Sequence, residues 1–194
     1  MIASESDAVN GLLRAMATFD ATTERHLTST AALAERVATT MALDAITVEN
    51  CRVGALLHDV GLLGVDPVVL HYPAMLTTAE WELIAAHPQS GARLLLGIPS
   101  LAHIANIVRA HHERIDGTGY PDALIGNEIP LEARIIAVAD AFHTMTMPLP
   151  YRDAFSTTSA VAELVGNSGS QFDEGVVAAF AMMIGVRQRH LRQA

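Results

Sequence analysis

The sequence predicts a single all-α domain. Aromatic residues make up only 5% of its 194 residues and alanine is abundant, which favours packed helices over a β-sandwich. Apolar residues make up 51% of the chain, enough for one domain with a sizeable core. They recur at helical spacing, and no segment keeps the alternation of a strand. We therefore expect a helical bundle with a short loop or hairpin between residues 113 and 130.

The first predicted helix carries one apolar stripe, formed by Val9, Leu12, Leu13, Met16 and Phe19. We assign residues 1–19 to a packing or dimer helix and residues 20–194 to the main domain. The alternative for the first segment is the stub of a link to a sensor domain.

Two further helices precede the first chemically informative motif. His26 shares a helix face with Thr30 and Val37, so its side chain should point toward the core. The next helix should span residues 49–59, with Thr47 as its N-cap.

Capping and breaking residues place the remaining helices. Thr77 and Glu80 form a capping-box pattern that opens a helix through residue 87. Pro99 begins a helix that leads to a His-His pair, and glycines and prolines then predict a loop over 113–130. Residues 131–146 form an apolar helix that Pro148 ends, and helices over 160–165 and 173–189 close the chain.

Charge and composition exclude several classes of partner. The net charge is -9, from 21 acids and 12 bases, which argues against binding to duplex nucleic acid or an anionic membrane. All 12 bases are arginines, so the chain contains no lysine. Its single cysteine, Cys51, allows no internal disulfide and suits core packing. The start lacks signal-peptide features and the longest apolar run is too short to span a bilayer, so we expect a cytoplasmic protein without membrane insertion.

Two doublets, His58-Asp59 and His111-His112, indicate a metal site. Neighbouring helical side chains diverge by about 100°, so each doublet can reach ions along one edge. The two oxygens of Asp59 can bridge two cations, which an imidazole cannot. Imidazole and carboxylate donors without thiolates suit iron, manganese or catalytic zinc. Two such ions roughly 3.5–4 Å apart would clamp phosphorus for in-line attack by a bound hydroxide. The residues thus predict metal-assisted phosphoester hydrolysis.

The order of the motifs resembles the HD-GYP domain, a branch of the HD phosphohydrolase superfamily. The resemblance covers about residues 20–185. It rests on His26, His58-Asp59-Val60-Gly61, His87-Pro88 with Gly91, His111-His112-Glu113-Arg114 with Asp116-Gly117, Gly119-Tyr120-Pro121, Ala133-Arg134-Ile135-Ile136 with Asp140, Pro150-Tyr151-Arg152, and Gly169 with Phe172-Asp173.

This resemblance implies an all-helical fold, a binuclear or trinuclear iron or manganese centre, and hydrolysis of cyclic di-GMP to pGpG or GMP. It implies that Asp59 is the bridging ligand that positions the hydroxide. The implied metal ligands are His26, His58, Asp59, His87, His111, His112 and Asp140. The resemblance implies that the turn of Gly119, Tyr120 and Pro121 lines the nucleotide pocket. We add Arg114 and Arg152 as substrate-binding cations, with Arg134 as a further candidate. The other reading of these polar residues is that they are buried and satisfied by hydrogen bonds.

The sequence departs from the family pattern around the expected centre. Where the family has a lysine after His-Asp-x-Gly, this chain has Leu62. Where many members have an arginine before Pro-Tyr, it has Leu149. A loop that often carries lysines has Tyr72 and Met75. Members with three metals carry a glutamate four residues before the first histidine, where this chain has Thr22. We therefore expect two metals. Loss of a general-acid contact costs on the order of 10²–10⁴ in rate, which leaves room for a slow enzyme.

Three functions remain open. The first is a binuclear phosphodiesterase acting on a cyclic dinucleotide. The second is a degenerate HD-GYP domain that keeps its metals and acts as a nucleotide sensor or docking module. The third is an enzyme for another phosphoester. Four other histidines are expected at the surface or partly buried: His71, His103, His143 and His190.

Overall fold

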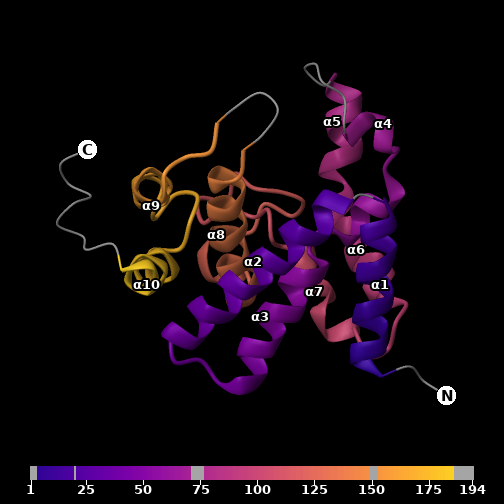
Figure 1. Cartoon of the computed structure of the whole chain (residues 1–194), viewed down its shortest axis with the longest axis horizontal. Coiled ribbons are helices and arrows are strands. Elements are labelled where there is room, and N and C mark those ends of the chain that lie inside the picture. The colour runs from indigo at the N-terminus through magenta and orange to yellow at the C-terminus, as the bar shows by residue number, and fades with distance from the viewer. Residues whose placement is uncertain (1–3, 20, 71–76, 149–152, 186–194) are drawn as a thin grey trace.

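The computed structural model describes residues 4–19, 21–70, 77–148 and 153–185, and these residues confirm the all-α prediction (Figure 1). Across them, extended structure is limited to two isolated bridges, Asp116–Ile125 and Ser168–Phe172. In chain order the helices are α1 (Glu5–Phe19), α2 (Ala21–Thr40), α3 (Ala45–Leu57), η1 (Val60–Gly64), α4 (Pro67–Leu70), α5 (Thr78–Ala85), α6 (His87–Leu96), η2 (Ala102–Ile104), α7 (Ala105–Arg109), η3 (Gly126–Glu128), α8 (Leu131–Thr146), α9 (Thr157–Gly166) and α10 (Glu174–Ile184), where η marks a 3₁₀ helix.

The centre of the fold is a layer in which α2 packs against both α3 and α8. On one side α9 and α10 contact α8, and on the other α6 contacts α7 and η1, as Figure 1 shows. Helix α1 contacts α2, α3 and η1, and its Val9 and Met16 are buried. The core therefore runs through the helices that carry the predicted ligand residues.

The N-cap of α3 differs from the prediction. The cap is Asp44, not Thr47, because a carboxylate oxygen of Asp44 accepts the backbone N–H groups of Ile46 and Thr47, both at 3.0 Å. The hydroxyl of Thr47 instead donates to the other Asp44 oxygen. The helix accordingly begins at Ala45 and ends at Leu57, which makes His58 its C-terminal cap.

The helix predicted through residue 87 is two helices. The capping box of Thr77 and Glu80 is confirmed and opens α5, but α5 ends at Ala85. Helix α6 starts at His87, with Pro88 in its first turn, where a missing N–H breaks no helical bond. The break places His87 at a helix start, where its ring turns inward.

Three further bounds were predicted with different accuracy. The predicted helix 131–146 has the bounds of α8. The helix predicted from Pro99 to the histidine pair is wrong in length, because the segment folds as η2 and the short α7. The last described helix, α10, is capped by Asp173 and ends before Gly185, whose φ of 78° favours glycine. In the part of the chain described here, no helix combines the length and apolar character that a membrane crossing requires.

Candidate metal centre

Seven predicted ligand residues converge from five parts of the chain. His26 comes from the second turn of α2 and Asp140 from α8, while His87 begins α6. The doublet His58-Asp59 follows α3, and His111-His112 follows α7. Three of the histidines are almost fully enclosed, with exposed fractions of 1%, 4% and 2% for His58, His87 and His111.

Local hydrogen bonds fix the orientation of these three buried rings. Each Nδ1 atom lies within 2.7 Å of the carbonyl oxygen three residues earlier: Ala55 for His58, Ile84 for His87 and Val108 for His111. A carbonyl only accepts, so each Nδ1 carries the proton and each Nε2 keeps its lone pair. This is the arrangement that orients metal-binding histidines in general.

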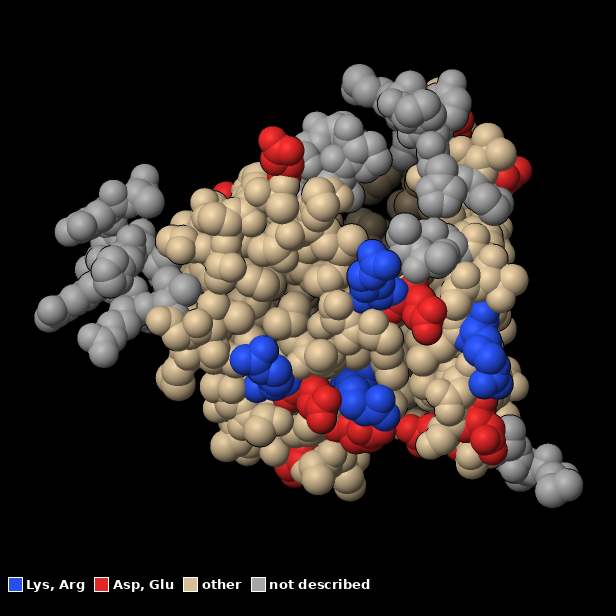
Figure 2. All heavy atoms as spheres, viewed as in Figure 1, with Lys and Arg blue, Asp and Glu red and all other residues tan. Residues whose placement is uncertain are grey.

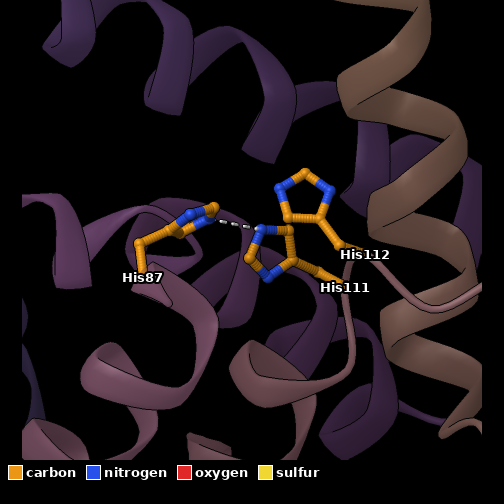
Figure 3. A group of neighbouring side chains, drawn as sticks. All are labelled: His87, His111 and His112. Carbon is orange, nitrogen blue, oxygen red and sulfur yellow. Dashed lines mark hydrogen bonds between the residues drawn. The ribbon is translucent and has the colours of Figure 1, made fainter. Parts of the chain in front are cut away.

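The ligand atoms form two groups joined by a third. One group is His87, His111 and His112, shown in Figure 3, where the ring of His87 points toward His111. The Nε2 atom of His87 lies 3.2 Å from the Nε2 atom of His111. The second group is His26, His58 and Asp140, and the joining group is His58, Asp59 and His111. Within each group every ligand atom lies within 4.8 Å of the others, close enough to surround one ion.

The carboxylate of Asp59 lies between the two groups. Its Oδ1 atom is 3.2 Å from Nε2 of His87, in the first group. Its Oδ2 atom is 3.3 Å from Nε2 of His58 and 4.0 Å from Nε2 of His26, in the second. One oxygen is thus directed to each group.

Burial and the charges of the centre favour lone pairs over protons on three donors, His111, His112 and Asp59. Burial, then the charges of His112 and His58, holds the pKa of His111 well below its usual range. Burial, then His87, lowers the pKa of His112 to about 4. Burial opposes ionisation of Asp59, but the surrounding histidines outweigh it and hold the carboxyl pKa well below normal. His26 differs, because its hydrogen bond and charge interaction with Asp140 overcome burial and raise its pKa.

A cavity of about 360 Å³ opens onto the centre. His111, His112 and Asp140 line it together with Gly119, Tyr120 and Arg114, three of the predicted substrate-binding residues. The Tyr120 ring stacks on His112, with centroids 4.9 Å apart and planes 27° apart. Burial, followed by the charges of Asp59 and Asp140, raises the phenol pKa to about 12, so Tyr120 is a neutral donor.

Comparison with known proteins identifies the fold family. A family model described as the HD domain matches residues 1–176. The chain belongs to the HD domain family. The cyclic di-GMP phosphodiesterase response regulator RpfG of Xanthomonas campestris pv. campestris is 37% identical over 171 residues, which are 87% of this chain and 45% of that protein. The chain therefore spans less than half the length of this curated relative.

Two solved structures share the fold. A cyclic GMP-AMP specific phosphodiesterase of V. cholerae, V-cGAP3, superposes with a TM-score of 0.71 and 19% identity, over 96% of this chain and 50% of that one. Bd1817 of Bdellovibrio bacteriovorus, described as an HDG"Y"P protein, has a TM-score of 0.66 and 18% identity, over 93% and 61%. Together with the family model and the relative above, they confirm the HD-GYP resemblance.

Two glycines of the HD-GYP motifs are needed for close backbone contacts. A Cβ atom on Gly61 would lie 2.0 Å from the carbonyl oxygen of His87, and one on Gly119 would lie 2.4 Å from the backbone nitrogen of Arg114. The first contact fixes the His-Asp motif against α6. The close approach at Gly119 lets the Gly-Tyr-Pro segment lie against the residues that follow the histidine pair. This segment contains a cis Tyr120–Pro121 bond.

Glu113 supports the same segment, a role that its motif did not reveal. It is 4% exposed, and its two oxygens accept the backbone N–H groups of Asp122 at 2.7 Å and Leu124 at 3.1 Å. A buried carboxylate thus satisfies two loop amides and holds the loop beside the predicted ligand residues.

Two of the predicted cationic residues, Arg114 and Arg134, are engaged within the protein. Arg114 bonds Asp116 and Thr118, and Arg134 bonds Asp173 at 2.5 Å. Figure 2 shows arginines beside acidic side chains over the face that it presents. Pro121 adjoins Tyr120 but is not among the described residues that line the cavity. Arg152, Leu149, Tyr72 and Met75, with His71 and His190, lie outside the described residues.

Leu62 lies one 3₁₀ turn beyond the HD doublet. Its backbone N–H donates to the carbonyl of Asp59 at 2.8 Å, and its side chain is partly exposed. An alkyl side chain, which carries neither charge nor a transferable proton, therefore follows the central carboxylate.

Sequence reasoning missed two aromatic neighbours of the centre. His143 is partly buried, as expected, but its Nδ1 lies 2.9 Å from Nδ1 of His26. Its position three residues after Asp140, on the same helix face, was a usable signal. Trp81 contacts Tyr120 from α5, and no sequence pattern indicated that contact. His103 is exposed, as predicted.

Proposed function

We propose that this HD domain is a phosphodiesterase that uses two metal ions to hydrolyse a cyclic dinucleotide. The proposed reaction converts cyclic di-GMP to pGpG or GMP. The observation that carries the proposal is the position of Asp59, whose two oxygens face two separate histidine groups. A carboxylate is the one side chain here that can bridge two cations through different atoms.

The donor set fits two ions. Imidazole nitrogens dominate, two carboxylates complete the set, and no thiolate lies among the grouped ligands. Such donors suit iron or manganese, and the two outer groups, joined by the group that contains Asp59, support a count of two. When bound, these ions would supply an electrophilic clamp on phosphorus and activation of water.

The residues of the site would hold the two ions and position the substrate and the nucleophile. His87, His111 and His112 would hold one ion, and His26, His58 and Asp140 the other. Asp59 would fix the spacing between the two ions and position the nucleophile. Gly119 leaves room for the loop to turn, and Tyr120, neutral and beside His112, can donate a hydrogen bond to a phosphate oxygen.

The substrate class rests on the relatives. RpfG is named for cyclic di-GMP and V-cGAP3 for cyclic GMP-AMP, so a cyclic dinucleotide is the class that these relatives share. The cavity wall of the HD centre supplies Arg114 as a cation, although Asp116 pairs with it. We propose Arg114 and Arg152 as phosphate contacts, with turnover slowed by the leucine at position 62.

The paired arginines favour a second candidate function. Arg114 and Arg134 are both bonded to carboxylates, and Leu62 carries no charge. A pocket with few unpaired cations binds a dianion less tightly and stabilises a leaving group poorly. A metal-bound nucleotide sensor or docking module is therefore the alternative.

A substrate panel separates these functions. Manganese- or iron-loaded protein would be incubated with cyclic di-GMP, cyclic GMP-AMP, a linear dinucleotide and a mononucleotide, with products resolved by chromatography. We expect cleavage of a cyclic dinucleotide, and its loss in Asp59→Asn. Binding of a cyclic dinucleotide in calorimetry without cleavage would favour the sensor. Cleavage of the linear substrates alone would reassign the enzyme to another phosphoester.

A further inference from the structure

The only tryptophan of the chain, Trp81, contacts a tyrosine that lines the cavity of the candidate metal centre. Trp81 is on α5, and its ring meets Tyr120 edge to face, with centroids 6.4 Å apart and planes 74° apart. Tyr120 in turn stacks on His112, a ligand candidate. Three rings therefore lead outward from the metal ligands to the surface.

The position of Trp81 is not explained by the core. Its side chain is 51% exposed, and α5 contains no buried residue. Trp81 is also absent from the apolar residues that form or adjoin the described core cluster. A half-exposed indole that contacts a cavity-lining tyrosine offers a π-face to a ligand, whereas a core tryptophan would be enclosed.

We propose that Trp81 and Tyr120 form a subsite in which a nucleobase of the cyclic dinucleotide stacks. This inference rests on the proposed function and adds a residue for base recognition. A base held there would place the attached sugar-phosphate toward His112 and the metal ligands, since Tyr120 contacts both Trp81 and His112.

Charge around the cavity supports stacking as the mode of binding. Arg114 and Arg134 are paired with Asp116 and Asp173, and the chain has no lysine. With these two cations engaged, an aromatic surface is a strong remaining means of holding a nucleotide. Stacking uses the π-face that every base has, so the subsite accepts guanine and adenine alike.

Tryptophan fluorescence tests the subsite directly because Trp81 is the only tryptophan. Metal-loaded protein would be titrated with a hydrolysis-resistant phosphorothioate analogue of cyclic di-GMP while indole emission is recorded. We expect saturable quenching. Steady-state kinetics with cyclic di-GMP should show KM raised about 5- to 150-fold in Trp81→Ala, the range that loss of one stacked base gives, with kcat changed far less.

Matched variants separate stacking from folding. Trp81→Phe keeps an aromatic ring and should retain most of the affinity. Leu83→Ala removes an apolar side chain that is 58% exposed on the same helix, and it should leave KM unchanged. Circular dichroism would confirm that α5 and the bundle are intact in each variant.

The outcomes distinguish this inference from the proposed function. Hydrolysis with unchanged fluorescence and an unchanged KM in Trp81→Ala would overturn the subsite and leave the phosphodiesterase standing. Absence of both hydrolysis and calorimetric binding would overturn the subsite together with the proposed function. Quenching with a KM effect in Trp81→Ala, but not in Leu83→Ala, would support it.

Discussion

The Nδ1 atom of His26 lies 2.9 Å from the Nδ1 atom of His143. Two imidazole nitrogens can approach so closely only when one carries a proton and the other offers a lone pair. The Nε2 atom of His26 faces Asp140, at 3.1 Å, and the metal-ligand group. With its Nε2 atom committed to a metal ion, His26 would donate through Nδ1 and His143 would accept. The other buried rings, those of His58, His87 and His111, donate to backbone carbonyls, which no substitution removes. The partner of His26 is a side chain, which a substitution can replace.

Replacement of His143 should weaken the ion held by His26. Loss of such an outer hydrogen-bond partner typically costs 10- to 100-fold in metal affinity, and we expect this for His143→Leu. His143→Asp offers a carboxylate to the same N–H group and should restore most of the affinity. Metal content after dialysis against graded chelator measures this, with exposed His103→Ala as control. Full retention of both ions in His143→Leu would show that His143 does not support metal binding by His26.

Gly61 and Gly64 form a natural pair of test sites in η1. A Cβ atom on Gly61 would clash with the backbone of His87, whereas one on Gly64 would meet nothing within 4 Å. We expect Gly61→Ala to destabilise the protein by about 1–3 kcal/mol or more, as overpacking does, and to lower its metal content. Gly64→Ala should change the free energy of unfolding by less than about 0.5 kcal/mol. Urea unfolding measures both, and equal effects would contradict the assigned contact.

Leu62→Lys should increase turnover if the rest of the centre is competent. A positioned proton donor contributes typically 10²–10⁴ in rate, so the gain should lie in that range. Leu62→Met controls for side-chain shape. Leu62→Arg supplies charge without a transferable proton, because arginine stays protonated. A gain with lysine alone identifies a missing general acid. No gain with any variant would show that Leu62 does not limit the rate.

The stability of chelator-treated protein should rise with pH between about 4 and 6.5. Burial lowers the pKa of His112 to about 4 and holds that of His111 well below 6.5, the value of both groups in an unfolded chain. Between these values the unfolded chain binds more protons, so acidification favours unfolding. The raised pKa of His26 acts above 6.5, outside this window. Thermal melting of wild type and His112→Asn measures the effect, and the variant should show a shallower dependence. Identical slopes would contradict the lowered pKa.

Much of this site could be predicted from the sequence because its ligands are carried by local motifs. The doublets and the capping box depend on residues close in sequence, and the structure brings all seven predicted ligand residues together. The Asp44 cap was missed because two candidate cap residues lie three positions apart, and only geometry shows which oxygen faces the helix amides.

Long-range contacts account for the features that the sequence did not predict. His143 meets His26 from a helix 117 residues further along the chain. Trp81 meets Tyr120 only because α5 folds beside the Gly-Tyr-Pro segment. Helix propensity and spacing do not specify such pairs, since they depend on how α2, α5 and α8 are packed.

The metal content of the purified chain tests the central claim most directly. Protein refilled with manganese and passed over a desalting column would be measured by inductively coupled plasma mass spectrometry, beside Asp59→Asn. The account predicts two ions per wild-type chain and no more than one in the variant, because the bridging carboxylate is lost. One ion or none in the wild type, or two retained in Asp59→Asn, would contradict a centre bridged by Asp59.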